Sequence, residues 1–491
     1  MKRLRVLLVL AGCTVGPEYH RPPAPVPSAY KDWKVATPAD AIPRGRWWTM
    51  FRDPELDGLV VRLNVNNQTI AQAVEDYVAA ASQIRAARSA LFPTATLSPS
   101  ASISRGGFVS QSSTGTTVST PTPGVSMATG GGGGRRVVYS LPADVSWAPD
   151  LFGRVRNTVH QNQYTAQARA ADVENVRLLQ QSTLAQTFFE LRGQDSLIEV
   201  LQETVKANEE IVNLTQASYR LGISNEAEVL QAQLTLQNAR VQATNAGVAR
   251  AQFENAIATL IGAPASSFSL PRRPLQASPP AIPHSTPSQL LERRPDIAAA
   301  ERAMAAANAA IGVGQAAYFP VLTLTGNAGF SSNMLSTLLS WPSRVWALGG
   351  TLAETIFDGG LRRANVDIAV ANYRSTVAAY RQTVLTAFQQ VEDQLAALAI
   401  LAVVIEEQRV AVEVAEKGFE VERARYATGL DPYVTLMTQQ TLLLAARQTL
   451  ITLEVQRMTA SVLLVQALGG GWSTIDLPSP AEVTTVRPGG R

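Results

Sequence analysis

Apolar residues recur every seven positions along two long stretches of the chain. The repeated positions are Leu184, Leu191, Ile198, Val205 and Val212, and then Val391, Leu398, Ile405, Val412 and Phe419. A period of seven is typical of helices that pack as coiled coils. No proline stands between Pro149 and Pro264, or between Pro342 and Pro432, and proline breaks helices. The pattern therefore predicts very long helices, the first from about Val155 to Leu221.

Elsewhere the apolar positions alternate with polar ones. Alternation runs from Leu97 to Ile103 and from Val137 to Trp147, and it returns from Leu322 to Ala328. A period of two indicates β-strands with one apolar face, and about 9–11 such residues cross a bilayer. Soluble hairpins alternate in the same way, so the pattern alone leaves a membrane sheet and a soluble sheet open.

Short sequences recur between the two halves. Phe92-Pro93 returns as Phe319-Pro320, an offset of 319 − 92 = 227, and Tyr219 and Gly222 return as Tyr426 and Gly429, an offset of 426 − 219 = 207. We interpret the chain as a tandem duplication. The first half then carries about 20 additional residues, which we place in the flexible Ser/Thr- and Gly-rich loop within Gly106–Arg136.

These patterns predict the organisation of the chain. We expect a signal peptide at 1–12, an extended lipidated segment at 13–56, a first repeat at 57–263, a linker at 264–287, a second repeat at 288–470 and a tail at 471–491. Each repeat reads helix, β-hairpin, long helix, turn, helix, with hairpins at 94–149 and 321–356. That gives four strands per chain. Since the smallest outer-membrane barrels have eight, several chains must contribute if the strands span lipid.

The N-terminus is typical of a secretory signal, with basic residues before a short apolar run. Leu10-Ala11-Gly12-Cys13 resembles a bacterial lipoprotein box, which would make Cys13 the acylated first residue of the mature protein. The alternative is an ordinary buried thiol. With Cys13 acylated, Thr14 resembles an outer-membrane sorting signal. No stretch offers 18 consecutive apolar residues, so no transmembrane helix is expected.

Composition excludes several classes of function. Lysine plus arginine (42) nearly balances aspartate plus glutamate (39), so we expect no nucleic-acid partner. One cysteine and three scattered histidines leave no zinc cage, and we expect no metal and no cofactor beyond a lipid on Cys13. No catalytic motif is present. Glu392 and Asp393 are adjacent, point about 100° apart on a helix and are poor acid–base partners, so we do not expect an enzyme.

The chain resembles the outer-membrane factors of bacterial tripartite efflux, of the TolC and OprM type, in their lipoprotein branch. The resemblance covers nearly the whole sequence and rests on motifs in a fixed order. These are Gly12-Cys13-Thr14-Val15-Gly16-Pro17, Trp47-Trp48, Phe51-Arg52-Asp53-Pro54, Asp150-Leu151-Phe152-Gly153-Arg154, Arg294-Pro295-Asp296, Ala300-Glu301-Arg302, Ile356-Phe357-Asp358-Gly359-Gly360 and Leu468-Gly469-Gly470-Gly471-Trp472.

The resemblance implies a mainly α fold with a membrane β-barrel. It implies a homotrimer whose twelve strands form one barrel above a long periplasmic barrel of helices. It also implies a lipid-anchored protein of the bacterial outer membrane, which passively conducts drugs or other small molecules with a periplasmic adaptor and an inner-membrane pump of the RND type. No substrate can be identified from the sequence.

In such proteins the duct narrows at the periplasmic turns between the long and short helices. Here those turns are centred on Gly222 and Gly429, which we also expect to dock the adaptor. By resemblance, the aperture residues are Glu228, Arg425, Tyr426, Asp431, Thr435 and Thr438. From spacing alone, charges near a helix turn are more often a solvated face or a cap. Relatives commonly place an aspartate at the position of Thr438, so we predict a less cation-selective aperture here.

Two rival interpretations remain. A duct for type I protein secretion would share the architecture and would be distinguished by its genomic neighbours. A trimeric coiled-coil fibre or adhesin would explain the heptads, but not the duplicated hairpins within each half.

Overall fold

The computed structural model describes residues 14–24, 26–27, 45–105, 135–276, 278–280 and 292–487. The expected signal peptide, Cys13 and the glycine-rich run at residues 130–134 lie outside the described residues. The chain divides into two compact units. One holds the residues up to Pro17 with Arg85–Val159 and Ala309–Ala369, and the other holds Glu18–Ile84, His160–Asn308 and Val370–Arg491.

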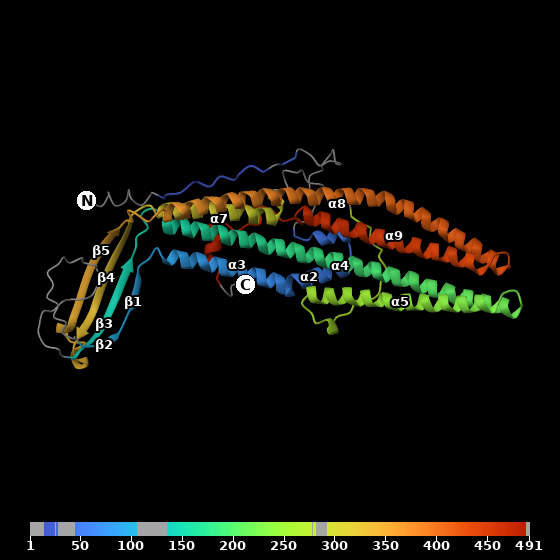
Figure 1. The fold of residues 1–491 in the computed structure, drawn as a ribbon, viewed down its shortest axis with the longest axis horizontal. Coiled ribbons are helices and arrows are strands. Elements are labelled where there is room, and N and C mark those ends of the chain that lie inside the picture. Colours follow the sequence, from blue (N-terminus) through green and yellow to red (C-terminus); the bar gives the residue numbers. More distant parts are fainter. Residues whose placement is uncertain are drawn as a thin grey trace. The chain divides into compact units, whose positions relative to one another are not determined.

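The first unit is built on one antiparallel sheet (Figure 1). Its strands are β1 (Thr94–Leu97), β2 (Ser100–Arg105), β3 (Arg135–Trp147), β4 (Val321–Ser332) and β5 (Arg344–Ala353). Their order is β1-β3-β4-β5, and β2 also pairs with β3. Asp144 on β3 lies opposite Asn327 on β4, so strands from the two halves of the sequence pair directly in one sheet.

The sequence predicts one strand where the structure has β1 and β2. Both strands pair with β3, and between them the amide of Ser98 donates to the carbonyl of Pro142 at 3.1 Å. Pro99 and Pro142 have no N–H to donate, and so the ladder is interrupted at this point. β1 and β2 therefore occupy one strand position, and the sheet is four positions wide.

The residues that directly follow Cys13 pack beside the end of β3. The amide of Val15 donates to the carbonyl of Phe152 at 3.2 Å, and the carbonyl of Val15 accepts from Asn157 Nδ2 at 2.7 Å. Gly153 has φ +80°, and a Cβ there would lie 2.6 Å from Thr14 Cγ2. Glycine is needed at this position for both its φ and its space. Thr14 is thus held within the first unit, against the segment that follows β3.

The helices are as long as the heptads predict. They are α2 (Pro54–Asn66), α3 (Gln68–Ser89), α4 (Arg154–Arg220), α5 (Glu226–Leu260), α7 (Pro295–Ala316), α8 (Leu361–Ala427), α9 (Tyr433–Ala467) and α10 (Pro480–Thr485). α4 and α8 each have 67 residues, α5 and α9 each have 35, and α3 and α7 each have 22. No helix among the described residues combines the length and the apolar character needed to span a membrane.

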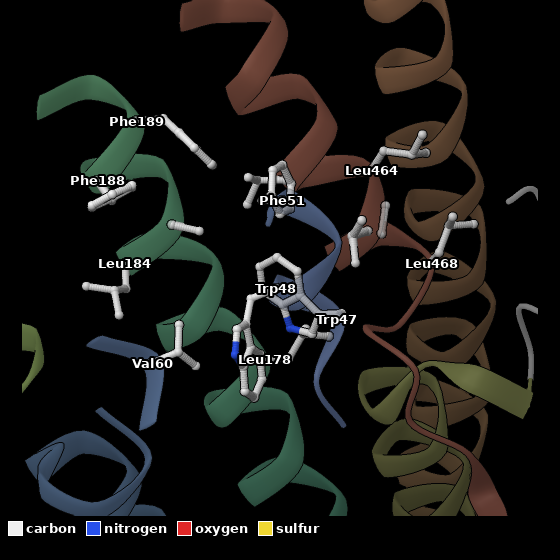
Figure 2. Packing of buried hydrophobic residues seen from close by; sticks show 14 of the residues in the cluster. Trp47, Trp48, Phe51, Val60, Leu178, Leu184, Phe188, Phe189, Leu464 and Leu468 are labelled. Carbon is white, nitrogen blue, oxygen red and sulfur yellow. The ribbon is translucent and has the colours of Figure 1, made fainter. Parts of the chain in front are cut away.

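The largest apolar cluster of the second unit gathers around Trp47, Trp48 and Phe51 (Figure 2). These side chains contact Phe188 and Phe189 of α4 and other apolar residues of α4 and α9. Burying an aromatic side chain of this size stabilises a fold by about 1.5–3 kcal/mol. The expectation of an extended segment at 13–56 is wrong here, because these aromatic residues form the 3₁₀ helix η3 (Trp47–Phe51) and α2 begins at Pro54.

The heptad positions lie inside the helical packing. Leu184, Leu191, Ile198 and Val212 are buried, as are Val391, Ile405 and Phe419. The remaining three, Val205, Leu398 and Val412, are half-buried. The prediction that this stripe carries the contacts of the long helices is confirmed.

Paired charges lie beside the aromatic cluster. Asp195 is buried and accepts from Arg192 Nη1 at 2.9 Å and from Arg250 Nε at 2.7 Å. Arg192 also pairs with Glu55, and Arg250 with Glu254. Each buried guanidinium thus has two carboxylate partners. Such partners offset the cost of removing the charge from water. The cluster ties α2, α4 and α5 together.

Candidate functional site

The turn from α4 to α5 is closed by backbone bonds around Gly222. The amide of Gly222 donates to the carbonyl of Tyr219 at 3.0 Å, and the amide of Ile223 donates to that of Ser218 at 2.9 Å. Gly222 has φ +72°, a conformation in which glycine avoids the strain of a side chain. Asn225 then caps α5 by accepting from the amide of Glu228 at 3.0 Å.

The turn from α8 to α9 repeats this geometry. The amide of Gly429 donates to the carbonyl of Tyr426 at 2.9 Å, and the amide of Leu430 donates to that of Arg425 at 3.0 Å. Gly429 has φ +73°, and its ideal Cβ position lies 3.7 Å from Ile223 Cγ2. The two turns therefore adjoin, and the α4/α5 and α8/α9 hairpins end at the same place (Figure 1).

Arg425 and Asp431 form a two-pronged ion pair across the second turn. Arg425 Nη2 donates to Asp431 Oδ1 at 3.0 Å, and Arg425 Nε donates to Asp431 Oδ2. The guanidinium holds the pKa of Asp431 below its usual range. The carboxyl of Glu422 lies beside Asp431, and its pKa is raised, first by desolvation and then by Asp431. The turn thus holds two neighbouring carboxyl groups and one guanidinium.

Tyr426 joins the two hairpins. It is buried on α8, and its hydroxyl lies 2.9 Å from the hydroxyl oxygen of Thr215 on α4. Thr215 directs its single proton to the carbonyl of Ile211 at 2.8 Å, so the Tyr426 hydroxyl is the donor between them. Burial raises the pKa of Tyr426, with a smaller contribution from Glu228, and the phenol stays protonated. Within one chain, Tyr426 lies between helices instead of on an open surface.

The other expected residues lie around this contact. Glu228 acts on Tyr426 electrostatically from the first turn of α5. Thr435 is half-buried on α9, and its amide donates to the carbonyl of Pro432 at 3.1 Å. Thr438 is exposed, and its hydroxyl donates to the carbonyl of Val434 at 2.8 Å. The structure therefore pairs Arg425 with Asp431, buries Tyr426 against Thr215 and leaves Thr438 exposed.

Further contacts between the hairpins lie above the turns. Arg423 of α8 pairs with Glu210 of α4 at 2.6 Å, and Arg447 of α9 pairs with Glu203 of α4 at 2.9 Å. These four residues were not among the sequence-predicted site residues, and neither were Thr215 and Glu422. No motif marks the ion pairs or Thr215, because the two partners of each contact lie more than two hundred residues apart. Glu422 lies only nine residues before Asp431, but no pattern distinguishes it from the other charges of α8.

The described residues contain no cluster of histidine, cysteine, aspartate or glutamate suited to a metal ion. The site consists instead of hydrogen bonds and ion pairs that can break and re-form. Such an arrangement can hold two helical hairpins together at their ends, or release them.

The sequence is similar to those of known outer-membrane efflux proteins. The model of a family described as outer membrane efflux protein matches residues 59–263 and 286–470. The chain is 31% identical over 472 residues to TtgC of Pseudomonas putida, a probable efflux pump outer membrane protein, covering 94% of each chain. It is also 31% identical over 473 residues to the outer membrane protein OprJ of Pseudomonas aeruginosa, covering 96% of this chain and 95% of OprJ.

The fold is similar to that of a solved outer-membrane channel. The open state of MtrE from Neisseria gonorrhoeae superposes with a TM-score of 0.77 at 26% identity. The match covers 95% of this chain and 100% of MtrE.

Proposed function

The chain belongs to the outer membrane efflux protein family, and on this premise we propose that it is the exit duct of a tripartite efflux pump. In this role it passively conducts drugs or other small molecules from the periplasm to the exterior. The observation that carries the proposal is the 31% identity to an efflux pump outer membrane protein along 94% of both chains. The family is one of channels, and we accordingly propose no enzymatic activity.

We propose that the working form is a homotrimer. Three copies of a sheet four positions wide supply a closed sheet of twelve strands, which would cover the strand edges that a single sheet leaves open. The matched lengths of α4 and α8, and of α5 and α9, support an internal duplication. A trimer would then bring together six similar helical hairpins.

We propose that Cys13 carries a lipid in the outer membrane. Thr14 and Val15 pack beside Phe152 and Asn157, near the end of β3. An acyl chain on Cys13 would start one residue before Thr14, which packs on Gly153, six residues beyond the end of β3. Residues 1–12 are the proposed signal peptide.

The proposed partners are a periplasmic adaptor and an inner-membrane pump of the RND type. The adjoining turns at Gly222 and Gly429 are the proposed docking tips, and Arg425, Tyr426 and Asp431 the proposed gate. Among the rival functions, the names of the relatives favour efflux over type I secretion. The two hairpins pair directly in one sheet, and a fibre made of coiled-coil helices would not contain such a sheet.

The test is complementation of a bacterium that lacks its own outer-membrane efflux component but keeps the adaptor and pump. Expression of the chain should restore resistance to the pump's substrates. Folded protein in the outer membrane that restores no resistance with any of several related pumps would contradict the proposal.

A further inference from the structure

The two faces of the sheet in the first unit differ in chemistry. Val145, Gly326 and Leu348 lie opposite one another on β3, β4 and β5. Because side chains alternate between the faces of a sheet, these residues share one face. The exposed large side chains of this apolar face are Leu97, Ile103, Val145, Trp346, Leu348 and Leu352. The opposite face is polar, and there Asn327 donates to Asp144.

Arginines stand at one end of the apolar face. At this end, which we call the far end, β2 is followed by β3 and β4 by β5, whereas the other strand ends lead to helices. Arg344 begins β5 two residues before Trp346, so it lies in the same row, and it is exposed. Arg105 and Arg135 are partners in the last register position of β2 and β3, two residues beyond Ile103. Three rows of the apolar face thus end at the position of an arginine.

No carboxylate accompanies these arginines in the sequence. Residues 95–143 and 328–353 contain four arginines, the fourth being Arg136, and no aspartate, glutamate or lysine. The acidic residues that follow these two ranges are Asp144 and Glu354. The far end of the sheet therefore carries a net positive charge, which favours an anionic partner.

The turn from β4 to β5 is apolar on its surface. Four of its large side chains are more than half exposed, namely Met334, Leu335, Leu339 and Trp341. Its hydroxyl groups bond within the turn: the hydroxyl oxygens of Ser332 and Thr337 lie 2.7 Å apart, and Ser343 Oγ donates to the carbonyl of Thr337 at 2.8 Å. The Arg344 guanidinium lies over the ring of Trp341. Because these polar groups are already bonded, placing the turn against an apolar medium costs little free energy.

We propose that the far end of the sheet binds phosphate-bearing lipids of the outer leaflet of the outer membrane. Arg105, Arg135 and Arg344 bind the lipid phosphates, while Leu339 and Trp341 lie against the acyl chains. A guanidinium can donate two parallel hydrogen bonds to a phosphate. The inference rests on the proposed function, which places the chain in that membrane.

The length of the apolar face fits this placement. From Arg344 to Leu352 there are 352 − 344 = 8 residue steps. At about 3.4 Å per step they cover about 27 Å along the strand. The apolar band of outer-membrane strands is about 25 Å tall. When this face spans the hydrocarbon, Arg344 therefore stands at the level of the lipid phosphates.

A second copy of the chain is a poor occupant of the far end. It presents the same arginines without carboxylates, and like charges repel. A phosphorylated lipid instead supplies an anion for the arginines and apolar chains for the exposed side chains of the turn. The charge of this end therefore favours lipid over another copy.

The test measures the binding of lipid A, a phosphorylated glycolipid, to the purified full-length protein in detergent. Arg135→Gln/Arg344→Gln should weaken this binding about tenfold or more, because two guanidinium–phosphate contacts are lost. The matched control Arg374→Gln/Arg381→Gln removes the same charge from exposed positions of α8 and should bind as the parent does. Lipid A stripped of its phosphates should bind the parent about tenfold more weakly.

The outcomes separate this inference from the efflux function. Equal affinity of the parent for lipid A with and without phosphates would overturn the inference, and this comparison needs no variant to fold. An equal loss in Arg374→Gln/Arg381→Gln would also overturn it, since net charge alone would then explain the binding. Resistance is measured in cells that express the same proteins. Resistance without lipid A binding refutes only the lipid site, whereas lipid A binding without resistance refutes only the efflux function.

Discussion

Tyr426 of α8 and Thr215 of α4 join the two helical hairpins of the chain through one hydrogen bond of 2.9 Å, next to the turns where both hairpins end. In the proposed duct, this bond would couple the position of the α8/α9 hairpin to that of the α4/α5 hairpin. Opening the narrow end by moving one hairpin would require the bond to break.

We expect Tyr426→Phe to loosen the aperture. A neutral hydrogen bond contributes about 1 kcal/mol, so its loss should raise the open-to-closed ratio about fivefold. Single-channel recording measures this ratio. Thr215→Val should act alike, and the double variant should add little to either change, since both remove one bond. Fully additive effects would show that Tyr426 and Thr215 act separately.

The carboxyl pair at the second turn should make the aperture sensitive to pH. The lowered pKa of Asp431 means that its pairing with Arg425 stabilises the turn above the usual aspartate pKa, and that this contribution is lost as pH falls through the lowered value. The raised pKa of Glu422 gives the stability of the turn the opposite dependence on pH. The protonated Glu422 stabilises the turn at low pH, and this contribution is lost as pH rises through the raised value.

Acidification from neutral pH should therefore first narrow the aperture, as Glu422 takes up a proton, and then loosen it as Asp431 does. Conductance recorded from pH 7 down to about pH 3 tests the order. Glu422→Gln should remove the first phase and leave the second. An unchanged profile in that variant would mean that Glu422 does not titrate against Asp431.

Thr438→Asp should make the aperture more cation-selective. Thr438 is exposed, so the substitution adds a carboxylate without disturbing packing, and a trimer would carry three. The reversal potential in a salt gradient measures the change, with Thr438→Asn as the uncharged control of similar size. The same conductance and ion preference in Thr438→Asp as in the parent would contradict a place for Thr438 at the constriction.

How much of the structure the sequence predicts depends on how far apart along the chain the interacting residues lie. The sequence predicts both ends of α4 within one residue and a second long helix without its bounds, and the outer-membrane efflux family predicted from ordered motifs is confirmed. The contact of Tyr426 with Thr215 joins residues 211 apart, and although the repeat of Tyr219 marks Tyr426, no local pattern marks Thr215 as its partner. Trp47 and Trp48 are expected in an extended segment because prolines crowd this part of the sequence, whereas burial against α4 and a hydrogen bond from Trp47 to Gln181 stabilise a turn of 3₁₀ helix there.

The buried charges of the second unit should matter more than the exposed ones. Asp195→Ala would leave Arg192 and Arg250 buried without their shared partner, at a cost of about 3–5 kcal/mol. Glu209→Ala removes a pair with Arg240 that is nearly half exposed, and should cost about 1 kcal/mol or less. Thermal unfolding of the purified protein compares them. Equal losses would contradict the assigned role of Asp195.

The most direct test of the exit duct is the conductance of the purified protein in a planar lipid bilayer, with its size in detergent measured on the same sample. The account predicts discrete current steps from a particle of three chains. A folded trimer that passes no current at any applied voltage would contradict it.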